Sequence, residues 1–156
     1  MDIFGGWKNY QQLLEENWLR LIAPEDTVVL AGDFSWGMNL QQAEADFAFV
    51  HKLPGKKILL KGNHDYWWTS KKKMEDFFTA HGFDSLNILH NNHYAFEQYG
   101  ICGTRGWVSM QGEAADAKIL AREVQRLAVS IQSAVKAGLE PIVFLHYPPI
   151  YGSSMN

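Results

Sequence analysis

The stretch Gly62-Asn63-His64-Asp65 carries the residue types best suited to chemistry, and it directly follows the apolar run 57–60. The Asn63 amide oxygen is a neutral, hard ligand that can bind a divalent cation without adding charge. The neighbouring His64 imidazole can donate a proton near neutral pH. Gly62 allows the backbone to turn sharply and to approach a ligand closely. This combination indicates hydrolysis of a phosphate ester at a metal centre.

Two further polar residues follow apolar runs in the same way. Asp33 comes after the run 27–31, and His146 comes after the run 141–145. Taken alone, Asp33 would more often be a turn or N-cap residue, and His146 a structural histidine at a strand end. Because ligands of parallel sheets bind at the carboxyl ends of the strands, we expect Asp33, Asn63 and His146 to converge on one sheet edge.

The elements that must position these residues alternate between helical and strand-like patterns, which predicts an α/β protein with parallel strands. Asn39 is the expected N-cap of the second helix and Gly82 the expected C-cap of the third. The Asn91-Asn92 pair indicates a hairpin turn. Helices are predicted over 7–22, 39–50, from 69 or 70 to 82, and 113–136, and strands over 27–31, 57–60, 88–89, 94–96, 99–102 and 141–145.

The faces of two helices are predicted by their apolar spacing. The first helix should bury Leu13, Leu14, Trp18, Leu21 and Ile22. The long fourth helix should bury Leu120, Val124, Leu127, Ile131 and Ala134.

Composition limits the classes of function. The 156 residues suffice for one domain with a sizeable core. A net charge of −3 gives no general attraction to nucleic acid or to anionic membranes. Cys102 is the only cysteine, which excludes an internal disulfide and favours the reducing cytosol. With no signal-peptide pattern and no apolar run near the roughly 20 residues of a membrane span, we expect a cytoplasmic protein without a membrane partner.

The motifs resemble those of the calcineurin-like metallophosphoesterases, in which Asp, Asn and His ligands follow successive strands. Gly32-Asp33, Gly62-Asn63-His64-Asp65 and His146 match this pattern in order. The stretches 32–36 and 65–68 are similar to a bacterial subgroup of predicted phosphohydrolases. The resemblance covers most of the chain, and it implies a single domain over 1–156 that is built as a two-sheet sandwich flanked by helices.

The resemblance also implies roles for the matched residues. Asp33 would bridge two divalent cations (Mn, Fe or Zn), and Asn63 and His146 would hold the second cation. His64 would remain unligated as the catalytic residue that contacts the substrate. Two cations roughly 3.5–4 Å apart orient a phosphate and activate a water for in-line attack. The expected reaction is hydrolysis of a phosphomonoester or phosphodiester, with a small phosphorylated or nucleotide-like substrate.

Three residues near the motif are candidates for contact with the substrate. Arg105 could reach a phosphate from its loop, although a surface arginine is the commoner interpretation. Trp67 could wall the pocket and stack on an aromatic leaving group, whereas core packing is the default. Asp65 could orient His64. Since Trp36 stands where protein-phosphatase relatives carry a carboxylate, we disfavour a phosphoprotein substrate.

Two motifs of the resembling family do not occur in this sequence: the opening Asp-x-His and the closing Gly-His-x-His. We therefore expect a domain that is truncated at both ends, with open sheet edges that favour a homo-oligomer. An alternative function is a catalytically inactive phosphoesterase-like module that binds a metal or a partner. A doubly wound nucleotide-binding module is disfavoured because no Gly-rich phosphate loop follows the first strand.

Overall fold

The computed structural model describes residues 9–107 and 114–149. Helices and strands alternate along most of the chain, as the apolar periodicity predicts. The elements are α1 (Tyr10–Leu21), β1 (Thr27–Leu30), α2 (Leu40–Lys52), β2 (Lys56–Leu59), α3 (Lys71–His81), β3 (Leu86–Ile88), β4 (Tyr94–Phe96), β5 (Tyr99–Thr104), α4 (Ala114–Lys136) and β6 (Glu140–Leu145).

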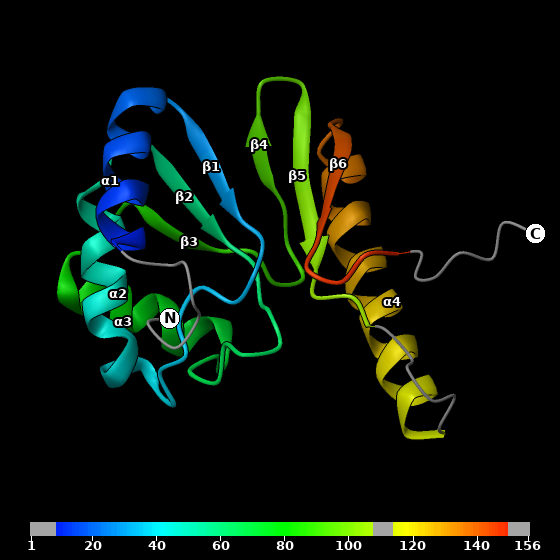
Figure 1. Ribbon diagram of the computed structural model, residues 1–156. Helices are drawn as coiled ribbons and strands as arrows, with labels where there is room; N and C mark the ends of the chain where they lie inside the picture. Colours follow the sequence, from blue (N-terminus) through cyan, green and yellow to red (C-terminus); the bar gives the residue numbers. More distant parts are fainter. Residues whose placement is uncertain (1–8, 108–113, 150–156) are drawn as a thin grey trace, which may run out of the picture.

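The strands form two three-stranded sheets. The first sheet has the order β1-β2-β3 and is parallel throughout. In the second sheet, β5 pairs antiparallel with β4 and parallel with β6. The helices α1, α2 and α3 lie outside the first sheet, and α4 lies outside the second (Figure 1). The expected α/β sandwich flanked by helices is therefore confirmed.

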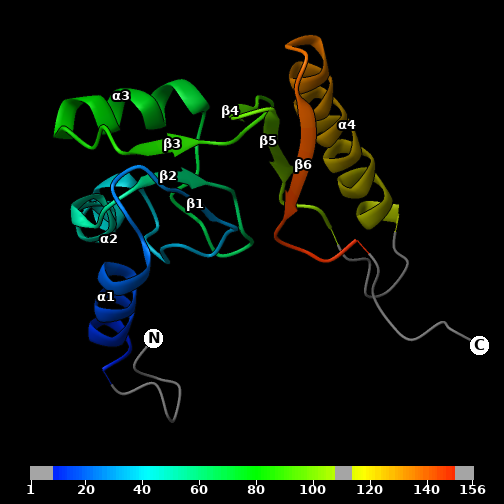
Figure 2. The same cartoon turned by 90° about the horizontal axis from the view of Figure 1, so that it is seen from above.

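Two apolar cores hold these layers together. β2 contributes to both because its side chains alternate between its two faces. Leu59 packs with the helices, where Phe47 of α2 contacts Trp67 edge-on at 4.9 Å between ring centroids. Ile58 faces the other way and belongs to the core between the two sheets, together with Leu60, Leu89 and Ile101. The two sheets and their outer helices can be followed from above in Figure 2.

The predicted caps of two helices are confirmed. The Asn39 side chain accepts a hydrogen bond from the Gln42 N–H at 3.0 Å and so begins α2. Ser70 caps α3 through its side chain, and Gly82 ends that helix with a φ of 69°. That left-handed conformation costs glycine little because it has no Cβ.

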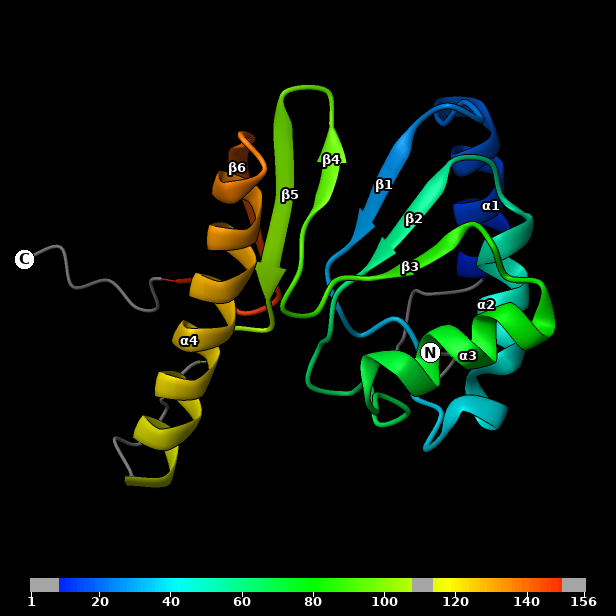
Figure 3. The same cartoon turned by 180° about the vertical axis from the view of Figure 1, so that it is seen from behind.

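The buried faces of α1 and α4 differ from the prediction. In α1, Trp18 is buried as predicted. Leu13, Leu14 and Leu21 were also expected to be buried but are exposed. α4 covers the second sheet (Figure 3), and Ala134 on it is buried as predicted. Leu127 and Ile131 are only partly buried, Leu120 and Val124 are exposed, and Glu123 and Ser130 are buried in their place. Polar side chains can face the sheet here because they are hydrogen-bonded: the Ser130 hydroxyl accepts from the Gly103 N–H and donates to the Asn92 carbonyl.

The segment around Asn91 was predicted as a hairpin turn, and this prediction is wrong. It carries the chain from β3 of the first sheet to β4 of the second, so it cannot join two paired strands. The hairpin connects β4 with β5 and turns at Glu97, whose φ is 52°.

The outer strand β6 is an edge of the second sheet, and Ile142 and Val143 on it are about 40% exposed. A homo-oligomer stays a prediction. None of the helices in the described ranges combines the length and the apolar character that crossing a membrane requires.

Candidate active site

The site lies where the two sheets meet. Asp33 follows β1 of the first sheet, and Asn63 and His64 follow β2 beside it. His146 follows β6, which belongs to the second sheet. The expectation that these residues converge on one edge of a single sheet is therefore corrected, since the convergence bridges both halves of the sandwich.

His146 presents a lone pair to the side chains of the first sheet. Its Nδ1 lies 3.0 Å from the Ala31 carbonyl oxygen, which can only accept, so Nδ1 carries the hydrogen. In the neutral ring Nε2 is then an acceptor, and it lies 2.7 Å from Asn63 Oδ1 and 3.6 Å from Asp33 Oδ1. Acceptors that face each other this closely need a cation or a proton between them. A histidine whose other nitrogen donates to a carbonyl is the usual arrangement of a metal ligand.

Asp33 is held by His64 through both of its oxygens. Oδ1 accepts from the His64 backbone N–H at 2.8 Å, and Oδ2 lies 2.8 Å from His64 Nδ1. Burial raises the pKa of Asp33, but its hydrogen bonds with His64 and the electrostatic effects of the His146 and His64 imidazoles lower it by more, so the net pKa lies below its ordinary value. The carboxylate is therefore anionic at neutral pH, as metal binding requires.

Gly32 and Gly62 let the two loops touch through their backbones. A Cβ on Gly62 would lie 2.2 Å from both the backbone N and Oδ1 of Asp33. A Cβ on Gly32 would lie 2.6 Å from Nδ1 of His146. These glycines precede Asp33 and Asn63 because no side chain fits between the loops that carry the candidate ligands.

Asp65 connects these two loops through hydrogen bonds to their backbones. It is 1% exposed, so it does not face a substrate. Its oxygens accept five hydrogen bonds of 2.7–3.2 Å, from the backbone N–H groups of Asp33, Phe34, Ser35 and Gly62 and from Nε1 of Trp67. The expected role of Asp65 in orienting His64 falls instead to Asp33.

Trp36 and Trp67 have different surroundings in the structure. Trp36 stacks on the imidazole, with ring centroids 5.0 Å apart and an angle of 30° between the planes. The exposed Trp36 thereby covers one face of the ring, and no carboxylate stands at this position. Trp67 is 2% exposed and packs in the core against Phe47, so it does not wall a pocket.

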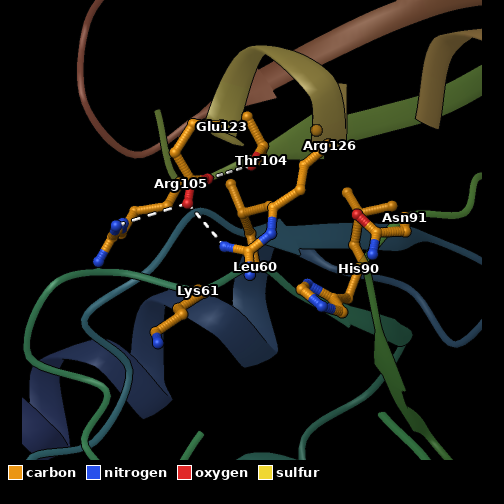
Figure 4. A pocket seen from close by; sticks show the side chains of 10 residues that line it. Leu60, Lys61, His90, Asn91, Thr104, Arg105, Glu123 and Arg126 are labelled. Carbon is orange, nitrogen blue, oxygen red and sulfur yellow. Dashed lines mark hydrogen bonds and ion pairs between the residues drawn. The ribbon is translucent and has the colours of Figure 1, made fainter. Parts of the chain in front are cut away.

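Arg105 belongs to a charged cluster that the sequence analysis missed (Figure 4). The buried Glu123 accepts from Thr104 Oγ1 at 2.5 Å and from Arg126 at 2.7 Å, and Arg105 lies 3.4 Å from it. Burial lowers the pKa of the nearby Lys61, and the charges of Arg105 and Arg126 lower it further. A signal was present: Glu123 lies between residues 120 and 127, on the predicted apolar face of the fourth helix.

The donor set suits a divalent cation. Carboxylate, amide and imidazole atoms from Asp33, Asn63 and His146 are a mixed oxygen and nitrogen set that Mn²⁺, Fe and Zn²⁺ accept. Within residues 9–107 and 114–149, no three side chains of His, Cys, Asp or Glu are grouped so as to hold a metal. The Asn63 amide oxygen would complete such a set beside Asp33 and His146.

The chain is similar to proteins that are already known. The chain is similar to a solved structure, the protein of unknown function AQ665 from Aquifex aeolicus, with a TM-score of 0.44 and 20% identity over 88% of this chain and 76% of that one. Its sequence matches the calcineurin-like phosphoesterase family over residues 2–155. Because this match spans nearly the whole sequence, the chain belongs to the calcineurin-like phosphoesterase family.

Proposed function

We propose that this chain hydrolyses a phosphomonoester or phosphodiester with the help of two divalent metal ions. The observation that carries the proposal is the His146 Nε2 lone pair, which lies 2.7 Å from the Asn63 amide oxygen and next to the Asp33 carboxylate. These three groups would hold a metal, with Asp33 shared between two ions. When bound, the metals neutralise the phosphate and make water more acidic.

The remaining chemistry comes from His64. Its Nδ1 is held by Asp33 Oδ2 at 2.8 Å, and its ring is packed against Trp36. These contacts hold the ring, whose Nε2 lies 3.3 Å from Nδ2 of Asn63 and so beside the candidate metal ligands. In the protonated ring, Nε2 donates its proton to the oxygen that leaves the phosphorus. The side chain is 38% exposed, so a substrate can reach it.

The test is turnover of bis-p-nitrophenyl phosphate and p-nitrophenyl phosphate with Mn²⁺ or with a chelator. Asp33→Asn is the informative variant because asparagine tolerates the φ of 56° at this position. We expect metal-dependent turnover in the natural chain and a loss on the order of a hundredfold or more in the variant.

Asp46→Asn is the matched control, since Asp46 accepts one hydrogen bond from Ser35 and is exposed. It should keep the activity of the natural chain. Equal metal-dependent turnover by Asp33→Asn and the natural chain would refute the proposal. Binding of Mn²⁺ without turnover would support the alternative function, an inactive metal-binding module.

A further inference from the structure

A positively charged pocket lies beside the candidate metal ligands, and the proposed reaction makes no use of it. Lys61, His90, Arg105 and Arg126 line it around the buried carboxylate of Glu123 (Figure 4). These residues come from the ends of β2, β3 and β5 and from α4, so both sheets contribute to the pocket.

The charges of this pocket do not balance among the described residues. Lys61, Arg105 and Arg126 carry three positive charges, and Glu123 supplies one negative charge. Asp65 is the other acid whose charge reaches Lys61, but its oxygens are occupied by backbone N–H groups. Because partly buried cations without counter-charges are costly, the pocket favours an anion.

Hydrogen-bond donors are also left over. The Arg105 Nε is buried and has no hydrogen-bond partner in the described part of the chain. The free space of the pocket admits a water but no phosphate, so this donor reaches an anion only through a water. The amine of Lys61 carries none of the hydrogen bonds or ion pairs drawn in Figure 4. A guanidinium and an ammonium group with free N–H donors are the groups that proteins use to bind phosphate oxygens.

The pocket adjoins the candidate metal ligands through the backbone. Lys61 precedes Asn63 by two residues, which span at most about 7 Å. The Arg105 carbonyl accepts a hydrogen bond of 2.9 Å from the N–H of Tyr147, the residue after His146. An anionic group bound here would therefore lie within the length of a small molecule from a phosphate at the metal site.

We propose that Lys61, Arg105 and Arg126 bind a second anionic group of the substrate, such as the non-reacting phosphate of a molecule with two phosphate groups. The proposal rests on the proposed function, which supplies the reacting phosphate. The free space between the side chains is about 10 Å³, room for about one water molecule. The anion is therefore held at the mouth of the pocket by the ends of the side chains and is not enclosed.

The first experiment measures binding of inorganic phosphate to the metal-free protein by calorimetry in the presence of a chelator. Lys61→Met should weaken binding about tenfold, since one charge-assisted contact is lost, and Lys61→Arg should restore it. Lys52→Met removes an equal charge from an exposed position in the last turn of α2 and should leave binding unchanged. Thermal unfolding verifies that every variant is folded. Absence of phosphate binding, or equal binding by Lys61→Met and the natural chain, would overturn the proposal.

The second experiment separates a substrate group from free phosphate. With Mn²⁺ present, adenosine 3′,5′-bisphosphate and adenosine 5′-monophosphate are compared as inhibitors of bis-p-nitrophenyl phosphate turnover. We expect the bisphosphate to inhibit about tenfold more strongly, and this ratio to fall at least threefold in Lys61→Met. Equal inhibition would overturn the assignment to substrate and leave a site for free phosphate. Absence of all turnover would refute the phosphoesterase proposal. The metal-free binding experiment would still show whether the pocket binds an anion.

Discussion

Replacing Asp65 by asparagine tests whether one buried carboxylate organises the site. The two side chains have nearly the same shape, but asparagine has one oxygen where aspartate has two. Asp65 Oδ1 accepts from Phe34, Ser35 and Trp67, and Oδ2 accepts from Asp33 and Gly62. In the variant an NH₂ group must face either three or two N–H donors, none of which can accept its hydrogens.

The expected loss of stability is estimated from Oδ2, because its two donors are fewer than the three at Oδ1. With the NH₂ group in the place of Oδ2, the N–H groups of Asp33 and Gly62 lose their acceptor, the first in a partly buried and the second in a buried position. Each buried donor without a partner costs about 1–3 kcal/mol, so the free energy of unfolding should fall by about 4 kcal/mol. For a chain of this size that corresponds to roughly 8–16 °C in Tm.

Urea unfolding followed by circular dichroism measures this loss, and Asp46→Asn is the matched control. Asp46 accepts one hydrogen bond from Ser35, and the oxygen of asparagine can still accept it. The control should lose less than about 1 kcal/mol. Mn²⁺ affinity should fall with stability in Asp65→Asn because the backbone of Asp33 and Gly62 shifts. A loss below about 1 kcal/mol would refute the view that these hydrogen bonds hold the two loops.

Two further predictions concern packing and pH. Gly62→Ala places a Cβ 2.2 Å from Asp33, so it should lower the free energy of unfolding by about 2–3 kcal/mol and weaken Mn²⁺ binding. Gly82→Ala meets open space and should lower it by about 1 kcal/mol because of the φ of 69°. Similar urea midpoints for the two variants would contradict this prediction. Burial lowers the pKa of Lys57 below its ordinary value of 10.5, although the charge of Asp84 opposes this shift. Between the lowered pKa and 10.5, Lys57 is protonated in the unfolded chain and deprotonated in the folded one. The free energy of unfolding therefore rises with pH in this range. Lys57→Met should flatten this rise in urea midpoints measured across the alkaline range, and an unchanged slope would count against the shift.

Much of the fold follows from local signals in the sequence. The caps at Asn39 and Gly82 were predictable because each depends on hydrogen bonds or backbone angles within a few residues. The strands before Asp33, Asn63 and His146 were predictable because short apolar runs bounded by turn residues indicate strands. Their predicted burial is confirmed for β2, whereas β1 is partly buried and half of β6 is exposed. Helix periodicity predicted that α4 exists and placed Glu123 on its apolar face. It could not predict the partners of the Glu123 carboxylate, Thr104 of β5 and Arg105 in the loop after it.

The sequence by itself determined which residue types can bind a metal and that each follows a strand. Only the tertiary structure decided how they meet. His146 reaches Ala31 across 115 positions of the chain and joins the site from the second sheet. Asp65 became a buried support rather than a substrate contact because four backbone N–H groups and an indole surround it. Such contacts join residues far apart in sequence, so their geometry is set by the packing of the two sheets and not by any local pattern.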